Sequence, residues 1–243
     1  AENLRVGSSA GHFSISRTGV LAYSRGEERS VNTLFEADRT GRLAGAALTA
    51  GLISNPAISP DRTRILFEKL PQQAGDREIW VRDLARATET KLTFGGGSAR
   101  MPAWSPDGRR FACVLAPPAG SAVLLIGSAD GLGGRDSNAA PGNAPPMLTQ
   151  WSPVSSRLVV VPSDFSGTFA ASTDSANAKL LPLAGATGIA AQSTLSPDGR
   201  WLAYASNEGG GQPQLYVQSL TGTPGRWQIS SVSGFHPAWT RGG

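Results

Sequence analysis

Apolar and polar residues alternate in short runs along this chain, and polar turns separate the runs. In the stretch 193–231, the runs WLAYAS and QLYVQSL alternate with the period of two that is typical of strands. The sequence Ser-Pro-Asp-Gly before the first run predicts a tight turn, because proline fixes φ, aspartate accepts a backbone hydrogen bond and glycine tolerates a positive φ. With STLS before this turn and RWQISS after the second run, the stretch predicts four antiparallel strands.

The same order of strand, turn and strand occurs five times, and a sixth copy begins near the C-terminus. Each copy has a serine or threonine anchor directly after an apolar residue, and successive anchors are 43 to 47 residues apart: Ser16, Ser59, Ser105, Ser152, Ser196 and Thr240. A period in the mid-forties built from short strands is typical of a β-propeller, in which each four-stranded repeat is one blade. The sequence therefore predicts a single all-β propeller domain over residues 1–243. We expect five full blades at about 12–54, 55–100, 101–147, 148–191 and 192–235, and the first strand of a sixth at 236–243.

The third and fourth repeats deviate most from the pattern. In the third, strands are expected at 101–105, 110–116 and 121–129, and a long stretch rich in Gly, Pro and Asn (131–146) predicts a loop. In the fourth, PVSSR replaces the Pro-Asp-Gly turn.

Two sets of residues recur at fixed places in the repeat. We interpret the apolar residue before each anchor as core between blades, and not as an aromatic cage, because a single binding site needs only one copy: Ile15, Ile58, Trp104, Trp151, Leu195 and Trp239. Asp61, Asp107 and Asp198 each follow Ser-Pro in a different blade. We expect these aspartates to stabilise turns and not to form a ring of carboxylates for a cation.

Composition excludes several classes of function. The formal charge is +4, but the basic residues are scattered singly, so no nucleic-acid partner is expected. The apolar runs are too short to span a bilayer, so no membrane contact is expected within the chain. Cys113, in the predicted strand FACVL, is the only cysteine, and neither a disulfide nor a cysteine-based metal site can form within the chain. We expect no cofactor and no metal.

Two short motifs resemble catalytic signatures but lack the context that the chemistry needs. Residues 7–11 read Gly-Ser-Ser-Ala-Gly, which formally matches a nucleophile elbow at Ser9. An elbow requires a following helix, and the strand pattern FSIS follows instead. Gly95-Gly96-Gly97 lacks the Lys and Ser or Thr of a phosphate-binding loop. We therefore predict no catalytic residues in this chain.

The residue four positions before each anchor varies from blade to blade, and it is our candidate for a ligand-binding site. Such variation is what a specific site needs, so we expect a partner peptide or small ligand to bind at the mouth of the central channel. The predicted site residues are His12, Asn55, Met101, Gln192 and His236. His12 and His236 occupy the same repeat position in the first and last copies. Polar channel lining is the favoured interpretation of these two imidazoles, and a metal or ligand site is the alternative.

The quoted motifs resemble a known family. SPDGRR, SPDGRWLAYASNEGG, EIWVRDL and QLYVQSL are similar to WD40-like, TolB-like propeller repeats. The order of FSISRTGVLAYSRG, NTLFEADRTGR, EIWVRDLARATETKLTF and GRWQISSVSGFHPAWTRGG resembles the C-terminal propeller of bacterial serine/threonine kinase-associated proteins of the acidobacterial type. The resemblance covers essentially the whole chain and implies six blades, a binding or sensing role and an extracytoplasmic location. It also implies that residues 2–9 supply the outer strand of the sixth blade.

Three functions compete on this evidence. The favoured hypothesis is a non-catalytic scaffold that binds a protein or peptide, or else a small ligand, within a larger bacterial signalling protein. The alternative is the propeller of a prolyl-oligopeptidase-type serine peptidase, whose hydrolase domain would lie outside this sequence. The third is a self-contained lyase or glycan hydrolase that uses the channel. Because the chain begins at Ala1 and stops just after a repeat begins, we expect it to be part of a longer protein. The sequence leaves the oligomeric state open.

Overall fold

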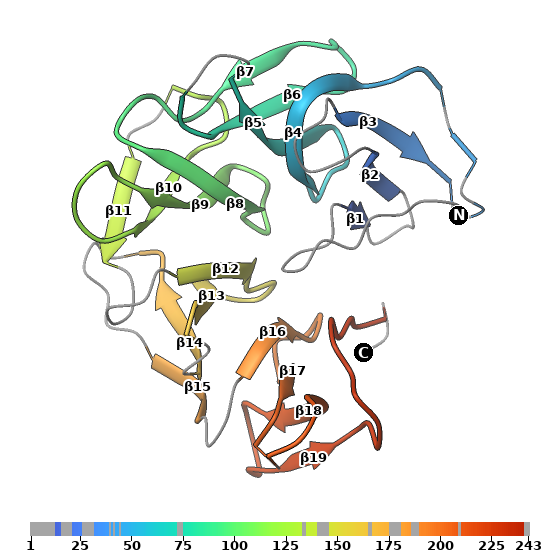
Figure 1. The fold of residues 1–243 in the computed structure, drawn as a ribbon, viewed down its shortest axis with the longest axis vertical. Helices are drawn as coiled ribbons and strands as arrows, with labels where there is room; N and C mark the ends of the chain where they lie inside the picture. Colours follow the sequence, from blue (N-terminus) through green and yellow to red (C-terminus); the bar gives the residue numbers. More distant parts are fainter. Residues whose placement is uncertain are drawn as a thin grey trace. The chain divides into compact units, whose positions relative to one another are not determined.

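All secondary structure in the described part of the chain is β-strand (Figure 1). The computed structural model describes residues 13–15, 21–25, 32–38, 40, 42–43, 45–71, 75–132, 135–139, 146–164, 167–174, 181–185, 190–208 and 210–240. This part of the chain contains nineteen strands, and the pairings between them that the structure describes are antiparallel. The chain divides into two compact units, residues 1–120 with 126–135, and residues 121–125 with 136–243. The predicted all-β class is confirmed.

The first seven strands of the first unit pair in sequence order. They are β1 (Phe13–Ile15), β2 (Leu21–Arg25), β3 (Asn32–Ala37), β4 (Thr49–Ile58), β5 (Arg64–Leu70), β6 (Glu78–Asp83) and β7 (Glu89–Lys91). The long strand β4 serves two blades. Its first three residues pair with β3, and the part from Leu52 to Ile58 pairs with β5. The predicted boundary between residues 54 and 55 thus falls inside a continuous strand.

The next sheet has the order β8 (Ser98–Trp104), β9 (Arg110–Ala116), β10 (Val123–Ser128) and β11 (Arg135–Ala139). Strand β11 lies within the stretch 131–146 that the sequence predicts as a loop, so that prediction is wrong for its residues. Gly, Pro and Asn lower strand propensity, but an outermost strand is held by main-chain hydrogen bonds to one neighbour and needs little from its side chains.

The second unit contributes two four-stranded sheets. One comprises β12 (Pro146–Trp151), β13 (Arg157–Pro162), β14 (Gly167–Ser172) and β15 (Leu181–Gly185), and the other β16 (Ala190–Leu195), β17 (Trp201–Ser206), β18 (Gln214–Ser219) and β19 (Arg226–Gln228). No strand is assigned to residues 229–240, so the inner strand that the sixth repeat predicts around Trp239 is not formed. A strand needs a hydrogen-bonded ladder neighbour, and none is assigned to this segment. Trp239 nevertheless contacts the fifth blade, because its Nε1 donates to the carbonyl oxygen of Thr194 at 3.1 Å.

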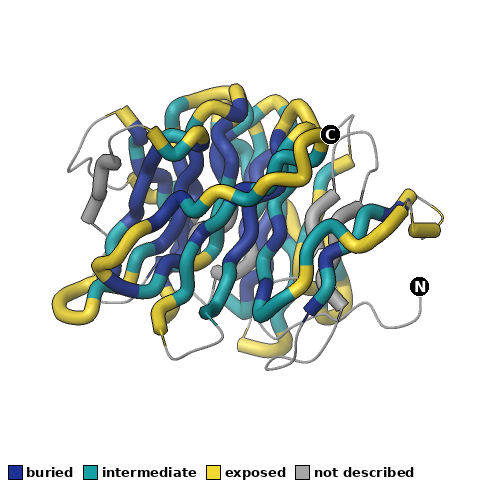
Figure 2. Tube along the Cα trace, turned by 90° about the horizontal axis from the view of Figure 1, so that it is seen from above, coloured by how far each residue is buried: buried dark blue, intermediate teal, exposed yellow. Residues whose placement is uncertain are grey.

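In the second to fifth blades the core follows the second strand, and Figure 2 shows buried residues concentrated in strands and exposed residues in the connecting turns. Strands β5, β9, β13 and β17 each bury four or five consecutive residues. The apolar residues before the anchors are buried in three blades, where Trp104, Trp151 and Leu195 are at most 8% exposed. Ile58 and Trp239 are half-buried, and the side chain of Ile15 lies outside the described part. The core interpretation is confirmed for the three buried residues.

The repeated aspartates hold turns, as predicted. In each Ser-Pro-Asp turn the serine hydroxyl donates to Asp Oδ1, at 2.6 Å for Asp61 and Asp107 and 2.5 Å for Asp198. The same Oδ1 accepts a backbone N–H two residues further on, at 3.0–3.1 Å. The serine hydroxyls lower the pKa of all three carboxyls, with further lowering from these backbone donors.

Candidate binding site at the inner-strand bulges

The first strand of each described blade from the second onward carries a β-bulge. The pairing register shifts between Ser54 and Ala57 in β4, between Arg100 and Ala103 in β8, between Leu148 and Gln150 in β12, and between Ala191 and Thr194 in β16. A bulge leaves extra residues outside the ladder and redirects their side chains, and bulges are enriched next to functional sites. Asn55, Met101 and Gln192 of the predicted site all lie in these bulges.

The bulges hold non-glycine residues in a left-handed conformation. The φ angles are 49° at Asn55 and 55° at Met101, and His236 at the same repeat position has 53°. Asparagine tolerates this region, whereas methionine and histidine adopt it at a cost of about 1–2 kcal/mol. Three chemically different residues thus have φ angles within 6° of one another. The conformation recurs at this repeat position in three copies, although the side chain differs.

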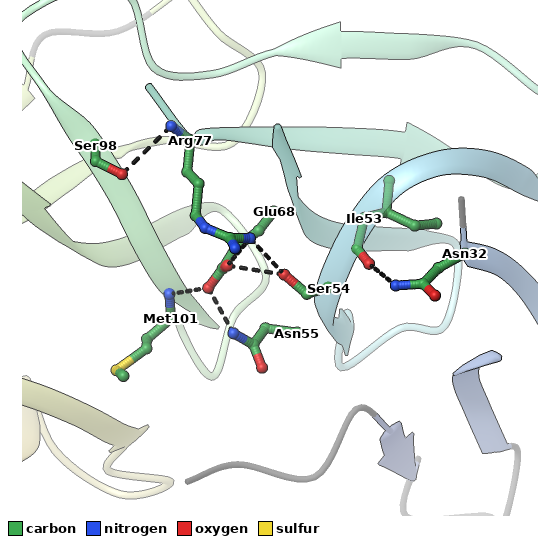
Figure 3. A network of polar contacts seen from close by, with 8 residues as sticks. All are labelled: Asn32, Ile53, Ser54, Asn55, Glu68, Arg77, Ser98 and Met101. Atoms are coloured by element: carbon green, nitrogen blue, oxygen red, sulfur yellow. Dashed lines mark hydrogen bonds and ion pairs between the residues drawn. The ribbon is translucent and has the colours of Figure 1, made fainter. Parts of the chain in front are cut away.

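A buried carboxylate joins the bulges of β4 and β8 (Figure 3). Glu68, on β5, is 2% exposed. Its Oε1 accepts a hydrogen bond from Asn55 Nδ2 at 2.6 Å and another from the backbone nitrogen of Met101 at 2.7 Å. The bulge releases this Met101 N–H from the β8–β9 ladder, so Glu68 satisfies a donor that the bulge would otherwise leave unpaired.

The second oxygen of Glu68 faces a hydroxyl and a guanidinium. Oε2 accepts a hydrogen bond from Ser54 Oγ at 2.9 Å, and Arg77 Nη1 lies 3.5 Å from Oε2. Arg77 Nη1 also donates to Ser54 Oγ at 3.2 Å. The backbone of Arg77 is fixed against β8, since its N–H donates to Ser98 Oγ at 3.3 Å and its carbonyl accepts from Ala99 N at 2.8 Å. The buried charge is therefore paired and fully hydrogen-bonded, as a buried carboxylate must be.

Sequence reasoning missed Glu68 and Arg77, although the repeat contains the signal for Glu68. Glu68 pairs with Ser54, just before the bulge. At the same repeat position, nine residues after the anchor, the third, fourth and fifth blades have Val114, Val161 and Ala205. RILFEKL has a single glutamate at this position, whereas RFACVLA, RLVVVP and WLAYAS have apolar residues there. A glutamate that is buried at such a position requires a charged partner.

The structure brings only part of the predicted site together. Asn55 and Met101 meet at Glu68 in the first unit. Gln192 lies in the β16 bulge and His236 is exposed, both in the second unit, and the side chain of Gln192 is outside the described part. His12 and Ser9 also lie outside the described residues, so the pairing of His12 with His236 stays a prediction.

Metal-binding clusters and membrane-spanning helices are both absent from the residues that the structure describes. Within these ranges, no group of three or more His, Cys, Asp or Glu side chains is placed to hold a metal ion. No helix long and apolar enough to cross a membrane was found in the part of the chain that the structure describes.

The network is suited to binding. Figure 3 shows the amide oxygen of Asn55 pointing away from Glu68 and the Met101 side chain extending away from the carboxylate. The Arg77 side chain remains 28% exposed. The site therefore offers a hydrogen-bond acceptor, an adaptable thioether and a partly exposed cation on a rigid frame.

Comparisons with known proteins identify the fold. TolB from Acinetobacter baumannii is similar over 94% of this chain and 56% of its own, with a TM-score of 0.71 and 21% identity. A putative TolB from Agrobacterium tumefaciens matches with a TM-score of 0.67 and 14% identity, over 89% of this chain and 80% of its own. The fold is that of a TolB-like β-propeller. An oligogalacturonate lyase solved with manganese is also similar, with a TM-score of 0.65 and 14% identity, over 89% of this chain and 63% of that one. No protein-family model and no curated sequence matches the chain.

These likenesses confirm the predicted fold and the TolB-like resemblance. Because the chain spans about half the length of the A. baumannii TolB it matches, the activity and partners of a whole protein are matters for proposal.

Proposed function

We propose that this chain is a non-catalytic scaffold that binds a protein or peptide partner at the inner-strand bulges around Asn55 and Met101. The observation that carries the proposal is the environment of Glu68. Its two oxygens receive donors from Asn55, Met101, Ser54 and Arg77. A carboxylate that is paired with a cation and accepts protein donors on both oxygens holds its neighbours in place, and both of its oxygens are already occupied.

The chemistry of the bulges favours a peptide. Met101 can adapt its unbranched side chain to different apolar surfaces, and Asn55 presents an amide oxygen that can accept a peptide N–H. Arg77 adds a partly exposed guanidinium, which favours a partner with carboxylate or carbonyl oxygens. The repeated backbone positions the side chains, and the identity of the side chain at each bulge determines which partner binds.

To test binding, peptides that bind the immobilised chain are selected from a displayed peptide library. Their affinities are then measured for the parent chain and for its variants. The double variant Asn55→Ala/Met101→Ala should lose about tenfold or more in affinity, which corresponds to about 1.4 kcal/mol. A matched control replaces one polar and one apolar residue elsewhere in the same unit, Thr90→Ala/Leu132→Ala, both of which are exposed. Peptides that bind both double variants as tightly as the parent chain would refute a site at the bulges.

We further propose that this propeller is the sensing part of a larger bacterial signalling protein of the kinase-associated kind, outside the cytoplasm. The motif order quoted above supports this proposal, and the TolB-like fold is compatible with it. The open reading frame around the chain provides the test. An upstream kinase domain with a membrane helix is the expected result. A downstream α/β-hydrolase domain would contradict this proposal and support the peptidase alternative.

A further inference from the structure

An indole fills the same place in the repeat in two blade contacts. Trp104 Nε1 donates to the carbonyl oxygen of Ala57 at 2.8 Å, and Trp239 Nε1 donates to that of Thr194 at 3.1 Å. In both contacts the acceptor lies two residues before the anchor of the preceding blade. Trp104 is 8% exposed, and the guanidinium carbon of Arg64 lies 4.8 Å from the centroid of its ring. The Trp104 indole thus fills the space between the second and third blades.

The second blade lacks this indole. Its residue at the same position is Ile58, which is smaller, has no donor and is half-buried. Ile58 lines a cavity of about 310 Å³, together with Glu36, Leu48, Asp61, Arg62, Ile65 and Leu84. All these residues belong to the first unit. Its volume is at the lower end of the range of about 300–1,000 Å³ that is typical of small-molecule sites.

The floor of the cavity is apolar and continuous with the core. Ile65 belongs to a buried cluster with Leu34, Ile53 and Phe67, and the other three apolar lining residues pack against this cluster: Leu48, Ile58 and Leu84. These three side chains are only partly buried, so they expose apolar surface to the cavity. An apolar group that enters it would remove this surface from water.

At the rim of the cavity, the lining residues that the structure describes include two acidic side chains and one basic side chain. Glu36 comes from β3, and Asp61 and Arg62 come from the turn between β4 and β5. Ser59 and Thr63 hold Asp61 Oδ1 in place. The Ser59 hydroxyl lowers the pKa of Asp61, which is therefore ionised at neutral pH.

We propose that this cavity binds a small aromatic amine. Its ring takes the place of the indole that the second blade lacks, and its ammonium group faces the carboxylates of Glu36 and Asp61. The ligand class follows from the apolar floor beside Ile58, where other copies of the repeat have an indole, combined with the two carboxylates and one cation among the described lining residues. This site is separate from the bulges around Asn55 and Met101, so each proposal can fail without the other.

The probe is tryptamine, and calorimetric titration of the whole chain measures its binding. Two related indoles test the charge requirement: uncharged 3-methylindole and anionic indole-3-acetate. Tryptamine should bind about tenfold more tightly than indole-3-acetate, a difference of about 1.4 kcal/mol. The variant Ile58→Trp fills the cavity with the repeat's own side chain and should lose tryptamine binding by at least about tenfold. Ile58→Val, which leaves the cavity open, should retain it.

A second variant keeps the test decisive if Ile58→Trp does not fold. Glu36→Gln removes one rim charge and should weaken tryptamine binding by about threefold to tenfold, with 3-methylindole binding unchanged. The double variant Asn55→Ala/Met101→Ala should bind tryptamine like the parent chain. The proposal is overturned if tryptamine does not bind at millimolar concentration, if folded Ile58→Trp binds it equally well, or if indole-3-acetate binds as tightly as tryptamine.

Discussion

Replacing Glu68 tests whether one buried carboxylate holds two blades together. Glu68→Gln preserves the shape of the side chain, removes its charge and turns one acceptor oxygen into an NH2 donor. If the NH2 takes the place of Oε2, it meets the Arg77 guanidinium, which can only donate, while the Ser54 hydroxyl can turn to accept from the NH2. If the NH2 takes the place of Oε1, it meets the Met101 N–H, which can only donate. At least one hydrogen bond is therefore lost in either orientation, and the remaining ones lose their charge assistance.

The magnitude follows from these contacts. A hydrogen bond to a charged group contributes about 1.5–3 kcal/mol and a neutral one about 0.5–1.5 kcal/mol. A neutral amide also costs less to bury than a carboxylate, which offsets part of this loss, so Glu68→Gln should cost about 3 kcal/mol. Glu68→Ala should cost about 4–5 kcal/mol, because it leaves the guanidinium of Arg77 without its buried partner. For a chain of this length, 3 kcal/mol corresponds to a fall in Tm of about 6–12 °C.

Thermal and urea unfolding of the variants measure these losses, and Glu89→Gln is the matched control. Glu89 pairs with Lys69 at 2.9 Å and with Arg82 at 3.4 Å, but its side chain is 18% exposed, compared with 3% for Glu68. Solvent screens the Glu89 pairs more, so this control should cost about 1 kcal/mol. Equal losses in Glu68→Gln and Glu89→Gln would refute the reasoning, because the Glu68 carboxylate would then add nothing beyond an ordinary ion pair.

Three further predictions concern the core, the turns and a glycine. Trp104→Ala should cost about 3–5 kcal/mol through a cavity between blades, and Asp107→Ala about 1 kcal/mol, since it removes turn hydrogen bonds; urea melts that give equal losses would contradict this. Gly97→Ala should cost well above 2 kcal/mol, because the new Cβ would lie 2.0 Å from the Ala116 carbonyl oxygen. Gly95→Ala is the control in the same assay. Gly95 has a φ of 60° and open space around the new Cβ, so this variant should cost only about 1–2 kcal/mol. The Ser105 hydroxyl, followed by the Arg109 N–H, lowers the pKa of Asp107 from its ordinary value of 3.8. The resulting stability is present above that value and is lost as the pH falls through the lower folded-state pKa, so urea midpoints should decrease below about pH 4, and less steeply in Asp107→Asn.

The repeat period and the turn chemistry alone predicted the all-β propeller fold. These features depend on near neighbours in the sequence. Alternation of apolar and polar residues favours a strand, and Ser-Pro-Asp-Gly favours a tight turn in any blade. The same local logic correctly assigned the aspartates to turns and Trp104, Trp151 and Leu195 to the core. It failed at β11, which is held by its neighbour, and around Trp239, where no ladder neighbour is assigned.

Variation between repeats also indicated the candidate site, but only tertiary structure showed what holds it. Asn55 and Met101 stand 46 residues apart in sequence, and no local pattern shows that both bond to Glu68. The φ angles of the bulges depend on pairing with the next strand, so the amino-acid composition does not predict them either. The cavity beside Ile58 depends on which side chains meet across two blades. The sequence by itself determined the strands and turns, because these depend on near neighbours. The tertiary structure decided the Glu68 network and the cavity, because both depend on contacts between residues from different strands.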